Sequence, residues 1–518
     1  MHNMHLFMIL CNIYHKESVI ILFSNQSKRI IQIMTDTAPL AATSILGQIQ
    51  TTDTEHPLHT HVSGLSPSLK MFKDTSKSLK DFFAPVTAWS PQNKDFPYLE
   101  AYKTLITNET SRLYGTKIAE TLARQIDTTP ICETGTHLSL LHDTDGNNTS
   151  YGFDNTLVLN RLVNSAAVYA ANDMKIHLGC RSSHVNITNT NGARFIQLYP
   201  KAALMALHSN KNSDNLVRYA PKVSDDVLQQ IQKQKYPVQF ATSVNDIVQA
   251  MTGKTTFADQ IAYTQSMQIN QFLPSTITDV TIDDSSLLEK LMIASFKDPS
   301  SLYHQIFADQ ALQTQFVHQL ADIRAGWRNT EDGMQSPFST VESSGNKKKI
   351  RRAMMDDFAH TPQNLASLME QGKIIPTCVM EFSFLLSQTG FLPHGGGFQH
   401  QYATEIQTAF TPFLHGIGAH DQANALASLP LDHAVLPQGA GIMQGDALVN
   451  FSSLLTNPVT SDELSKLADT PVQTLFAISA PDIYNFFHIN ENKSAGNEPL
   501  FMPEQYYADY TKPSLIIR

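Results

Sequence analysis

Three segments of the sequence combine residue types and spacings that suit ligand chemistry. The first is Thr134-Gly135-Thr136-His137, which follows a short predicted strand. A glycine at a strand end lets the backbone approach a ligand closely, and a nearby histidine can contact a phosphoryl oxygen. We therefore expect this turn to bind a nucleotide, with His137 as a catalytic residue. The alternative is a strand-end turn that carries a surface histidine.

The second segment, FLPHGGGFQHQYATEIQTAF, contains His394, Gly395, Gly396 and Gly397 ahead of a predicted helix. Glycines before a helix leave backbone N–H groups available to bind an anion, and the helix N-terminus favours negative charge. We expect the three glycines to form a tight turn that binds the cofactor and faces the same cavity as His137. His394, directed inward, is the second predicted catalytic residue. A flexible hinge is the alternative.

The third segment is SSGNKKKIRR, which contains Lys347, Lys348 and Lys349 and has five cations in six residues. A mobile loop with this charge can neutralise the phosphates of a nucleotide. We therefore expect these lysines to bind the phosphates of ATP, with Mg²⁺ as a companion ion. The alternative is the solvated start of a basic helix, because charge runs usually lie at the surface.

Histidine and glutamate recur along the C-terminal part of the chain, at His394, His400, Glu405, His415 and His420. Such side chains can hold a metal ion, but their spacing matches no familiar zinc pattern. We assign no metal ligand, and a metal-dependent enzyme built on this His/Glu cluster remains an alternative function. The earlier segment HPLHTH is interpreted as part of a polar lead-in rather than as a specific metal site.

The composition limits the classes of protein to which this chain can belong. The chain has 518 residues, 42% hydrophobic and 16% charged, which is typical of a folded protein of about two to four domains at roughly 150 residues each. A formal net charge of -10 disfavours a general nucleic-acid binder. Four scattered cysteines without a C-x-x-C pair favour a reducing cytoplasm. We therefore expect a cytoplasmic protein with a small-molecule substrate and no nucleic-acid or membrane partner.

Residues 1–33 differ from the rest of the chain. HKES interrupts their apolar runs, so neither run reaches the roughly 20 residues of a membrane span. The basic start and small-residue cleavage site of a secretory signal are missing. Met34 opens an ordinary polar N-terminus. We expect residues 1–33 to be an upstream extension, followed by a flexible lead-in as far as residue 66.

The order of the predicted elements sets the fold class. A short strand ends at Thr134, a helix covers 153–173, and further strands lie in MKIHLGC and ARFIQLY. This strand–helix–strand order is typical of a parallel sheet. We predict an α/β fold, with a Rossmann-like parallel-sheet core, large helical insertions and a helical C-terminal part.

Helical periodicity covers much of the remaining chain. It predicts helices within 67–126, 223–327 and 362–413, whereas 329–352 has the composition of a long polar loop and 428–450 that of strands and loops. We therefore expect four parts, which are 1–66 as extension and lead-in, 67–222 as the first part of the core, 223–345 as a mainly helical insertion, and 346–518 as a helical and glycine-loop part that completes the core.

The segment GKIIPTCVMEFSFLLSQTGFLPHGGGFQHQY resembles a segment of the bacillithiol-biosynthesis cysteine-adding enzyme family. The matching residues are Gly372, Pro376, Phe391, His394, Gly395, Gly397 and Tyr402. ICETGTHLSLL is also similar to that family's T-G-x-Q turn after a strand, with His137 in place of the glutamine. HLGCRSSHVN stands where the family has an acidic and histidine segment.

The resemblance implies a Rossmann-like nucleotide-binding core with helical insertions and a helical tail. It also implies ATP-dependent, ligase-like chemistry that joins an amino acid or a thiol to a small-molecule acceptor through an activated intermediate. Because HLGCRSSHVN departs from the family pattern, a non-catalytic binding protein on the same fold is a further alternative.

Overall fold

The computed structural model describes the chain from residue 56 onward, with gaps, and every structural statement below concerns the described residues. They are 56–65, 67–91, 96–134, 138, 161–184, 216–233, 238–344, 347–436, 442–444, 447–448, 454, 458–477, 479–480, 483–484 and 515–516. The predicted strand ARFIQLY lies outside them.

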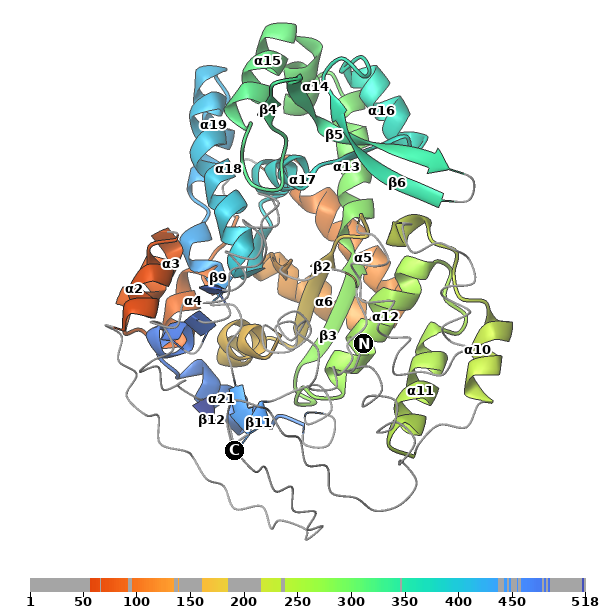
Figure 1. Ribbon diagram of the computed structural model, residues 1–518, viewed down its shortest axis with the longest axis vertical. Helices are drawn as coiled ribbons and strands as arrows, with labels where there is room; N and C mark the ends of the chain where they lie inside the picture. Colours follow the sequence, from red (N-terminus) through yellow and green to blue (C-terminus); the bar gives the residue numbers. More distant parts are fainter. Residues whose placement is uncertain are drawn as a thin grey trace, which may run out of the picture. The chain divides into compact units, whose positions relative to one another are not determined.

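Five parallel strands form the central sheet, in the order β3-β2-β1-β8-β9 (Figure 1). The predicted α/β fold with a Rossmann-like parallel core is therefore confirmed. The strands are β1 (Ile131–Glu133), β2 (Ile176–Arg181), β3 (Thr278–Asp283), β8 (Leu392–Gly396) and β9 (Val435–Leu436).

The strand order reverses between β1 and β8. From β1 the chain adds β2 and then β3 on one side, and it later adds β8 and then β9 on the other side. Glu133 of β1 is in register with Gly179 of β2 and with His394 of β8. Such a reversal leaves a crevice at the carboxyl ends of the two middle strands, which is where ligands bind in open α/β sheets.

The third core strand corrects the predicted layout. β3 lies within 223–345, which we expected to be a mainly helical insertion, and pairs with β2 along its whole length. Buried polar and buried apolar residues alternate along β3, so it lacks the continuous apolar run that would identify a buried strand in the sequence. Residues 346–518 contribute β8 and β9 to the same sheet.

Helices pack against the three-stranded part of the sheet. α5 and α12 contact β3, while α6 and α13 contact β2. Among the helices predicted within 67–126, α5 and α6 are separated at Gly115, which adopts φ 92, a left-handed conformation that suits glycine. The helices are α5 (Leu99–Tyr114), α6 (Thr116–Thr128), α12 (Phe257–Asn270) and α13 (Asp284–Lys297).

The predicted helix at 153–173 is confirmed over its described part. Residues 161–164 are α-helical and continue into the π-helical turn η1 (Ser165–Tyr169) and the 3-10 turn η2 (Ala170–Asn172). The helix ends at Asp173, whose φ of 52 is left-handed. π-helical turns place side chains out of the usual helical register and occur often at functional sites.

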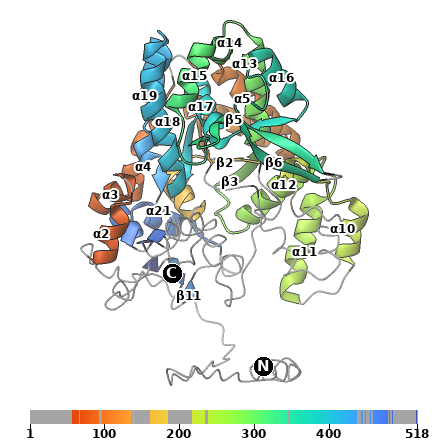
Figure 2. The same cartoon turned by 45° about the horizontal axis from the view of Figure 1, so that its top comes forward.

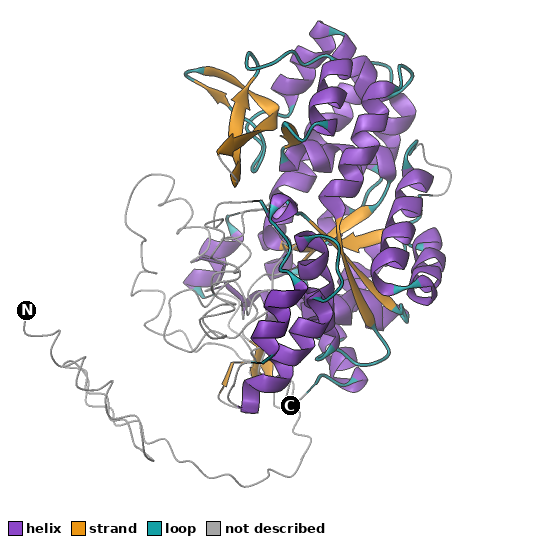
Figure 3. Cartoon of the chain, turned by 90° about the vertical axis from the view of Figure 1, so that its right-hand side faces the viewer, coloured by secondary structure: helices purple, strands orange, loops and turns teal. Residues whose placement is uncertain are grey.

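Residues 329–352, expected to be a polar loop, form strands over most of their described part instead. β4 (Asn329–Thr330), β5 (Gly333–Ser344) and β6 (Lys347–Met354) make an antiparallel sheet, and β7 (Ile374–Pro376) also pairs with β5. Figure 3 shows these strands as a group apart from the central sheet. Cross-strand pairing, such as Val341 opposite Ile350, stabilises a hairpin that its polar composition concealed.

Helices are present in 362–413 as predicted, but the strands β7 and β8, which were not predicted, lie between them. The helices are α16 (Pro362–Glu370), α17 (Cys378–Phe384), the π-helical turn η5 (Leu385–Thr389) and α18 (Gly397–Gly416). α18 follows β8 directly and packs against α15 and α19 (Figure 2). The remaining helices of this region are α14 (Leu302–Ala308), α15 (Gln310–Gln319), α19 (His420–Ala427) and the 3-10 turn η6 (Leu431–His433).

A second, smaller hydrophobic core lies under the helices that follow β2. It joins α12 to α10 (Asp225–Gln232), α11 (Val238–Met251) and the 3-10 turn η4 (Val217–Tyr219). Leu138, from the segment after β1, is fully buried in the same cluster. The segment after β1 is therefore anchored on these helices at one point.

Ordered structure begins earlier than the expected start near residue 67. α2 (Pro57–Ser63) lies inside the segment interpreted as a flexible lead-in, because Leu58 and Val62 share one helical face and are both buried. The His59 ring packs edge-on against Phe476. α3 (Pro67–Asp74), α4 (Leu79–Thr87) and α21 (Ser461–Ala468) complete the helices of this region.

Short strands occur in the last hundred residues, in line with the strands and loops predicted for 428–450. β10 (Ile442–Gln444), β11 (Ala447–Leu448) and β12 (Leu515–Ile516) form a three-stranded sheet. In the described part of the chain, no helix combines the length and apolar character that crossing a membrane requires.

Candidate functional site

Polar residues gather at the carboxyl edge of the central sheet, where the parallel strands end together. They are Glu133 and Thr134 at the end of β1, Ser183 and His184 after β2, Asp283 and Asp284 at the end of β3, and His394 in β8. Ligands bind outside this edge in doubly wound sheets. The edge, centred on the reversal between β1 and β8, is therefore the candidate site.

One face of the same sheet is polar although it is buried. Successive residues of a strand point to opposite faces of the sheet, so residues two apart in one strand share a face. Residues paired in register on neighbouring strands also share a face. Register and alternation place these polar residues and one glycine on the polar face: Glu133, His177, Gly179, Arg181, Asp279, Thr281 and His394. The opposite face carries apolar residues such as Leu178 and Val280.

Glu133 lies at the centre of a buried ion cluster. Its Oε2 accepts hydrogen bonds from Arg161 Nη1 at 2.6 Å and from Arg181 Nη2. Arg161 Nε lies 3.4 Å from Asp279 Oδ1. Each of the four side chains is at most 2% exposed, so two carboxylates and two guanidiniums compensate one another inside the protein. Unpaired charge is very costly at such a position.

His177 connects this cluster to η1. Its Nε2 lies 2.8 Å from Arg161 Nη1 and its Nδ1 lies 2.9 Å from Ser165 Oγ. Arginine has only donors, so Nε2 accepts and Nδ1 carries the proton that is donated to Ser165. Burial, together with the nearby Arg161, holds the pKa of His177 well below its ordinary value, and the ring is neutral.

His394 is directed inward, toward the buried polar face. Its Nδ1 donates to Asn164 Oδ1 at 2.8 Å, and its Nε2 accepts from the Tyr169 hydroxyl at 3.1 Å. Burial and the charges of Arg161 and Arg181 lower the pKa of His394 to about 3. Because protein groups occupy both ring nitrogens, the geometry suits a residue that positions β8 rather than one that contacts substrate.

Gly179 leaves room for the two arginines. A Cβ atom at this position would lie 2.9 Å from Arg181 Nη2 and 3.0 Å from Arg161 Nη2. These guanidinium groups are held by Glu133 and cannot move without breaking buried hydrogen bonds. Glycine is therefore required here by close packing.

Gly179→Ala should lower the free energy of unfolding by about 1 to 3 kcal/mol, the usual cost of overpacking a buried site. Denaturant unfolding followed by circular dichroism measures this change. Gly416→Ala is the matched control, because a Cβ at the end of α18 meets nothing within 4 Å. Equal stability of the two variants would show that the arginines can rearrange freely.

His184 lies between two carboxylates beyond the end of β2. Its Nε2 is 2.9 Å from Glu289 Oε1 and its Nδ1 is 3.0 Å from Glu381 Oε1. Burial alone would lower the pKa of His184, but Glu289 and Glu381 outweigh it and raise the pKa to about 10. The ring is therefore an imidazolium that joins α13 to α17.

Arg218 extends this second cluster toward the surface. It donates to Glu289 Oε2, and its backbone N–H donates to the Ser183 carbonyl. Burial would raise the pKa of Glu289, but His184 and Arg218 outweigh it and hold the pKa below its usual value. Glu289 is thus ionised at neutral pH and lies between the cations His184 and Arg218.

Asp284, the first residue of α13, is a carboxyl group suited to proton transfer. The Tyr102 hydroxyl donates to its Oδ1. Burial raises the pKa of Asp284 to about 7; the hydrogen bond from Tyr102 opposes this shift, and the nearby charges of Glu381 and Asp283 add to it. A carboxyl group that titrates near neutral pH is able to act as a general acid or base.

Several polar atoms at this edge lack a hydrogen-bond partner among the described residues. They include the buried Thr134 Oγ1 after β1 and Asp283 Oδ1 at the end of β3. Ser183 is close enough to Asp283 to lower its pKa, although burial dominates and raises that pKa overall. Buried polar groups usually have partners, so groups without one at a single sheet edge fit a ligand-binding role.

The three predicted phosphate-binding lysines, Lys347, Lys348 and Lys349, lie in β6 and not in a loop or a helix start. Lys348 Nζ is 4.2 Å from the centre of the Tyr219 ring. Tyr219 follows Arg218, so the hairpin reaches the second ion cluster of the carboxyl edge.

The three glycines after His394 do not form a separate turn. Gly395 and Gly396 end β8, and Gly397 begins α18, because the Gly395 N–H bonds to the Ala434 carbonyl and extends the parallel ladder. They nevertheless lie beside the end of β1, since Thr134 N–H donates to the His394 carbonyl. Gly135, Thr136 and His137 lie outside the described residues, so their predicted roles stay predictions.

The structure does not bring together the five residues of the hypothetical metal site. His394 is buried under β8, whereas His415 and His420 contact each other at the far end of α18, roughly 30 Å away at 1.5 Å per residue. Glu405 lies near Arg324. Within the described ranges, no three His, Cys, Asp or Glu side chains are arranged to hold a metal ion.

Sequence reasoning missed most of the charged residues at this edge. Asp283 and Asp284 follow the alternating segment TDVTI, and Ser182, Ser183 and His184 follow MKIHLGCR, so polar residues directly after strands were an available signal. Glu133 also precedes the predicted Thr134 turn. Glu289 and Glu381 lie within helices and could not be found without the fold.

Comparison with known proteins adds no relative to this description. Neither a scan against protein-family models nor a search of the curated proteins finds a match for this chain.

Proposed function

We propose that the protein is a nucleotide-binding, ligase-like enzyme of the cytoplasm that uses ATP to join an amino acid or a thiol to a small-molecule acceptor. The observation that carries this proposal is the junction of β8 and α18. Two glycines end the strand, a third begins a 20-residue helix, and the junction lies beside the end of β1, where the strand order reverses.

A nucleotide phosphate fits the chemistry of this junction. The N-terminus of a long helix offers backbone N–H donors and favourable polarity toward an anion, and glycine allows a close approach. Thr134 Oγ1, buried and without a partner in the described part of the chain, is a further polar group at the adjacent strand end. Bound ATP would supply the activating group.

The charged residues on the β2 and β3 side support acceptor binding and proton transfer. Arg218 and Lys348 provide positive charge at the carboxyl edge. Asp284, with its pKa near 7, is able to accept the proton that an attacking amine or thiol loses. The resemblance to the bacillithiol-biosynthesis cysteine-adding enzyme family agrees with this assignment of chemistry.

ATP with Mg²⁺ at millimolar concentration should raise the melting temperature of the full chain, because a ligand that binds only the folded state stabilises it. Gly135→Val and Gly396→Ala should each reduce the shift through loss of close backbone approach. Gly416→Ala, outside the junction, should leave the shift unchanged. Thermal unfolding followed by intrinsic fluorescence measures all four proteins.

The outcomes separate the competing functions. No thermal shift with ATP, with or without Mg²⁺, would overturn the ligase proposal. A shift without any consumption of ATP in the presence of amino acids and thiols would favour a non-catalytic binding protein. Stoichiometric metal in the purified protein, found by elemental analysis, would instead favour a metal-dependent enzyme.

A further inference from the structure

A cavity of about 360 Å³ lies at the opposite, amino-terminal edge of the central sheet. Lys175 and Ile277, which line it, directly precede β2 and β3. Its other walls come from α4, from the η1–η2 turn and from α21. The cavity is therefore distinct from the candidate site, and its volume falls within the range of small-molecule pockets.

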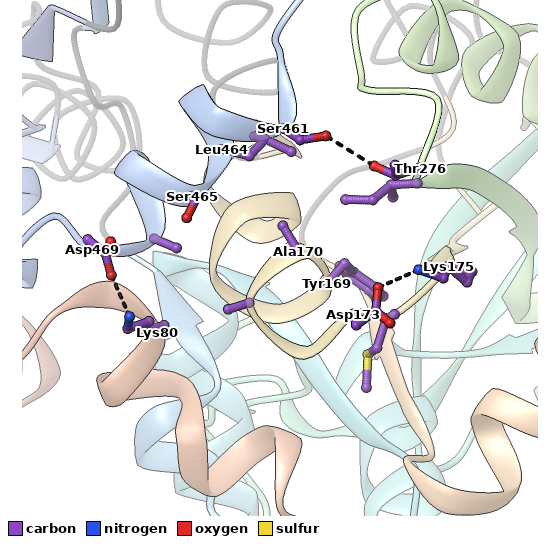
Figure 4. Close-up of a pocket in the computed structure, with 14 residues that line it drawn as sticks. Lys80, Tyr169, Ala170, Asp173, Lys175, Thr276, Ser461, Leu464, Ser465 and Asp469 are labelled. Atoms are coloured by element: carbon purple, nitrogen blue, oxygen red, sulfur yellow. Dashed lines mark hydrogen bonds and ion pairs between the residues drawn. The ribbon is translucent and has the colours of Figure 1, made fainter. Parts of the chain in front are cut away.

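One part of the cavity lining is apolar, although polar groups make up more of the lining as a whole. The apolar wall is formed by small or aliphatic residues of the η1–η2 turn, the segment before β3, and α21, namely Ala170, Ala171, Met174, Ile277, Leu464 and Ala468. Figure 4 shows that these elements surround the space from different sides. An apolar wall of this size suits the side chain of a small ligand.

Two ion pairs and a pair of hydroxyl groups surround that wall. Lys80 Nζ lies 2.5 Å from Asp469 Oδ1, and Lys175 pairs with Asp173 on another side (Figure 4). Thr276 and Ser461 bring their hydroxyl oxygens to 3.5 Å. The rim therefore presents both signs of charge, together with neutral hydrogen-bonding groups.

The ion pairs of the rim can open toward a ligand at low cost. The side chains of Lys80 and Asp469 are 47% and 56% exposed, and exposed pairs of this kind contribute roughly 0 to 1 kcal/mol. Each lysine lies next to an aspartate. A ligand with only a negative charge is therefore repelled by the carboxylate, and a ligand with only a positive charge is repelled by the ammonium group. A ligand that carries both charges satisfies both partners at once.

We propose that this cavity binds a small zwitterion of the α-amino-acid type, with its carboxylate on a lysine, its ammonium group on an aspartate and its side chain on the apolar wall. The inference rests on the cavity alone and not on the proposed ligase function. It assigns the protein a second ligand site, separated from the candidate site by the length of the sheet strands.

Isothermal titration of the full chain with L-leucine, L-methionine and L-alanine tests the proposal. At least one of the three should bind, and its methyl ester and its N-acetyl derivative should each bind at least about tenfold more weakly. Equal binding of the derivatives would overturn the proposal, as would absence of binding by all three amino acids at millimolar concentration.

Variants then locate the site. The double change Lys80→Ala and Asp469→Ala removes one rim pair without leaving a lone charge, and should weaken amino-acid binding at least about tenfold. Lys297→Ala with Glu370→Ala removes a similarly exposed pair elsewhere and should leave binding unchanged. Unchanged binding in the Lys80/Asp469 variant would overturn the assignment.

The two proposals can fail independently. The Lys80/Asp469 variant should keep the ATP-induced thermal shift, whereas Gly396→Ala should keep amino-acid binding to the cavity. Loss of amino-acid binding in Gly396→Ala would show that the amino acid binds at the candidate site, and would overturn the second site.

Discussion

Replacing Glu133 by glutamine should lower the free energy of unfolding by about 3 to 5 kcal/mol. Glutamine keeps the shape but loses the charge that Arg161 and Arg181 share, and their guanidinium groups remain buried around it. Asp279 then remains beside Arg161, and Arg181 keeps only the more distant attraction of Asp279 and Asp284 among the described carboxylates. The midpoint of urea unfolding, measured by circular dichroism, reports this loss.

The control for Glu133 is another glutamate that pairs with an arginine. Glu342 contacts Arg351, but its side chain is 56% exposed, so Glu342→Gln should change the stability by less than about 1 kcal/mol. If the two variants lose the same stability, the buried cluster is neither rigid nor dry, and its charges do not compensate one another in the way that the contacts indicate.

Replacing His184 by glutamine should also cost about 3 to 5 kcal/mol near pH 6, because Glu289 and Glu381 then lose the cation between them. His318, exposed in the last turn of α15, provides the control. His318→Gln should change the stability by less than about 0.5 kcal/mol.

The contribution of His184 to the free energy of unfolding should depend on pH if it comes from the charge of the ring, and should not if it comes from packing. The folded-state pKa is raised from 6.5 to about 10, so the folded protein binds more protons between these values. The stabilisation is complete below about pH 6.5 and is lost as the pH rises through about 10. The lowered pKa of Glu289 adds stability above about pH 4.5 that is lost as the pH falls.

The difference in the free energy of unfolding between the wild-type protein and His184→Gln should therefore be largest between about pH 4.5 and 6.5 and should decrease on either side. Urea unfolding at a series of pH values measures it. A difference that does not change between pH 5 and 10 would assign the effect to packing and would contradict the imidazolium.

The sequence predicted those parts of the fold that depend on local pattern. The helix ending at Asp173 and the strand in MKIHLGC were found because their apolar periodicity is strong. β3 was missed because Asp279 and Thr281 point into a buried polar layer, where the usual rule of apolar interior positions fails. The basic hairpin was missed because cross-strand pairing, and not composition, stabilises it.

The candidate site was predictable to a similar extent. Thr134 was placed at a strand end and His394 before a glycine run that precedes a helix, and the structure brings these two segments side by side, although the strand that holds His394 was not predicted. The partners of His394 could not be predicted, because Asn164 lies 230 residues away and reaches it only through the sheet topology. The same holds for Glu289 and Glu381 around His184.

The position of β8 has a consequence for synthesis. β1, β2 and β3 leave the ribosome more than a hundred residues before β8, which corresponds to roughly 5 to 20 s of translation. During this time β1 is an edge strand, because β8, its neighbour on one side, has not yet been made. The open side of such a strand can pair with other chains. Slower synthesis at low temperature or assistance by a chaperone should therefore have its largest effect on the yield of folded protein while residues 284–396 are being added. A chain that stops before β8 should aggregate.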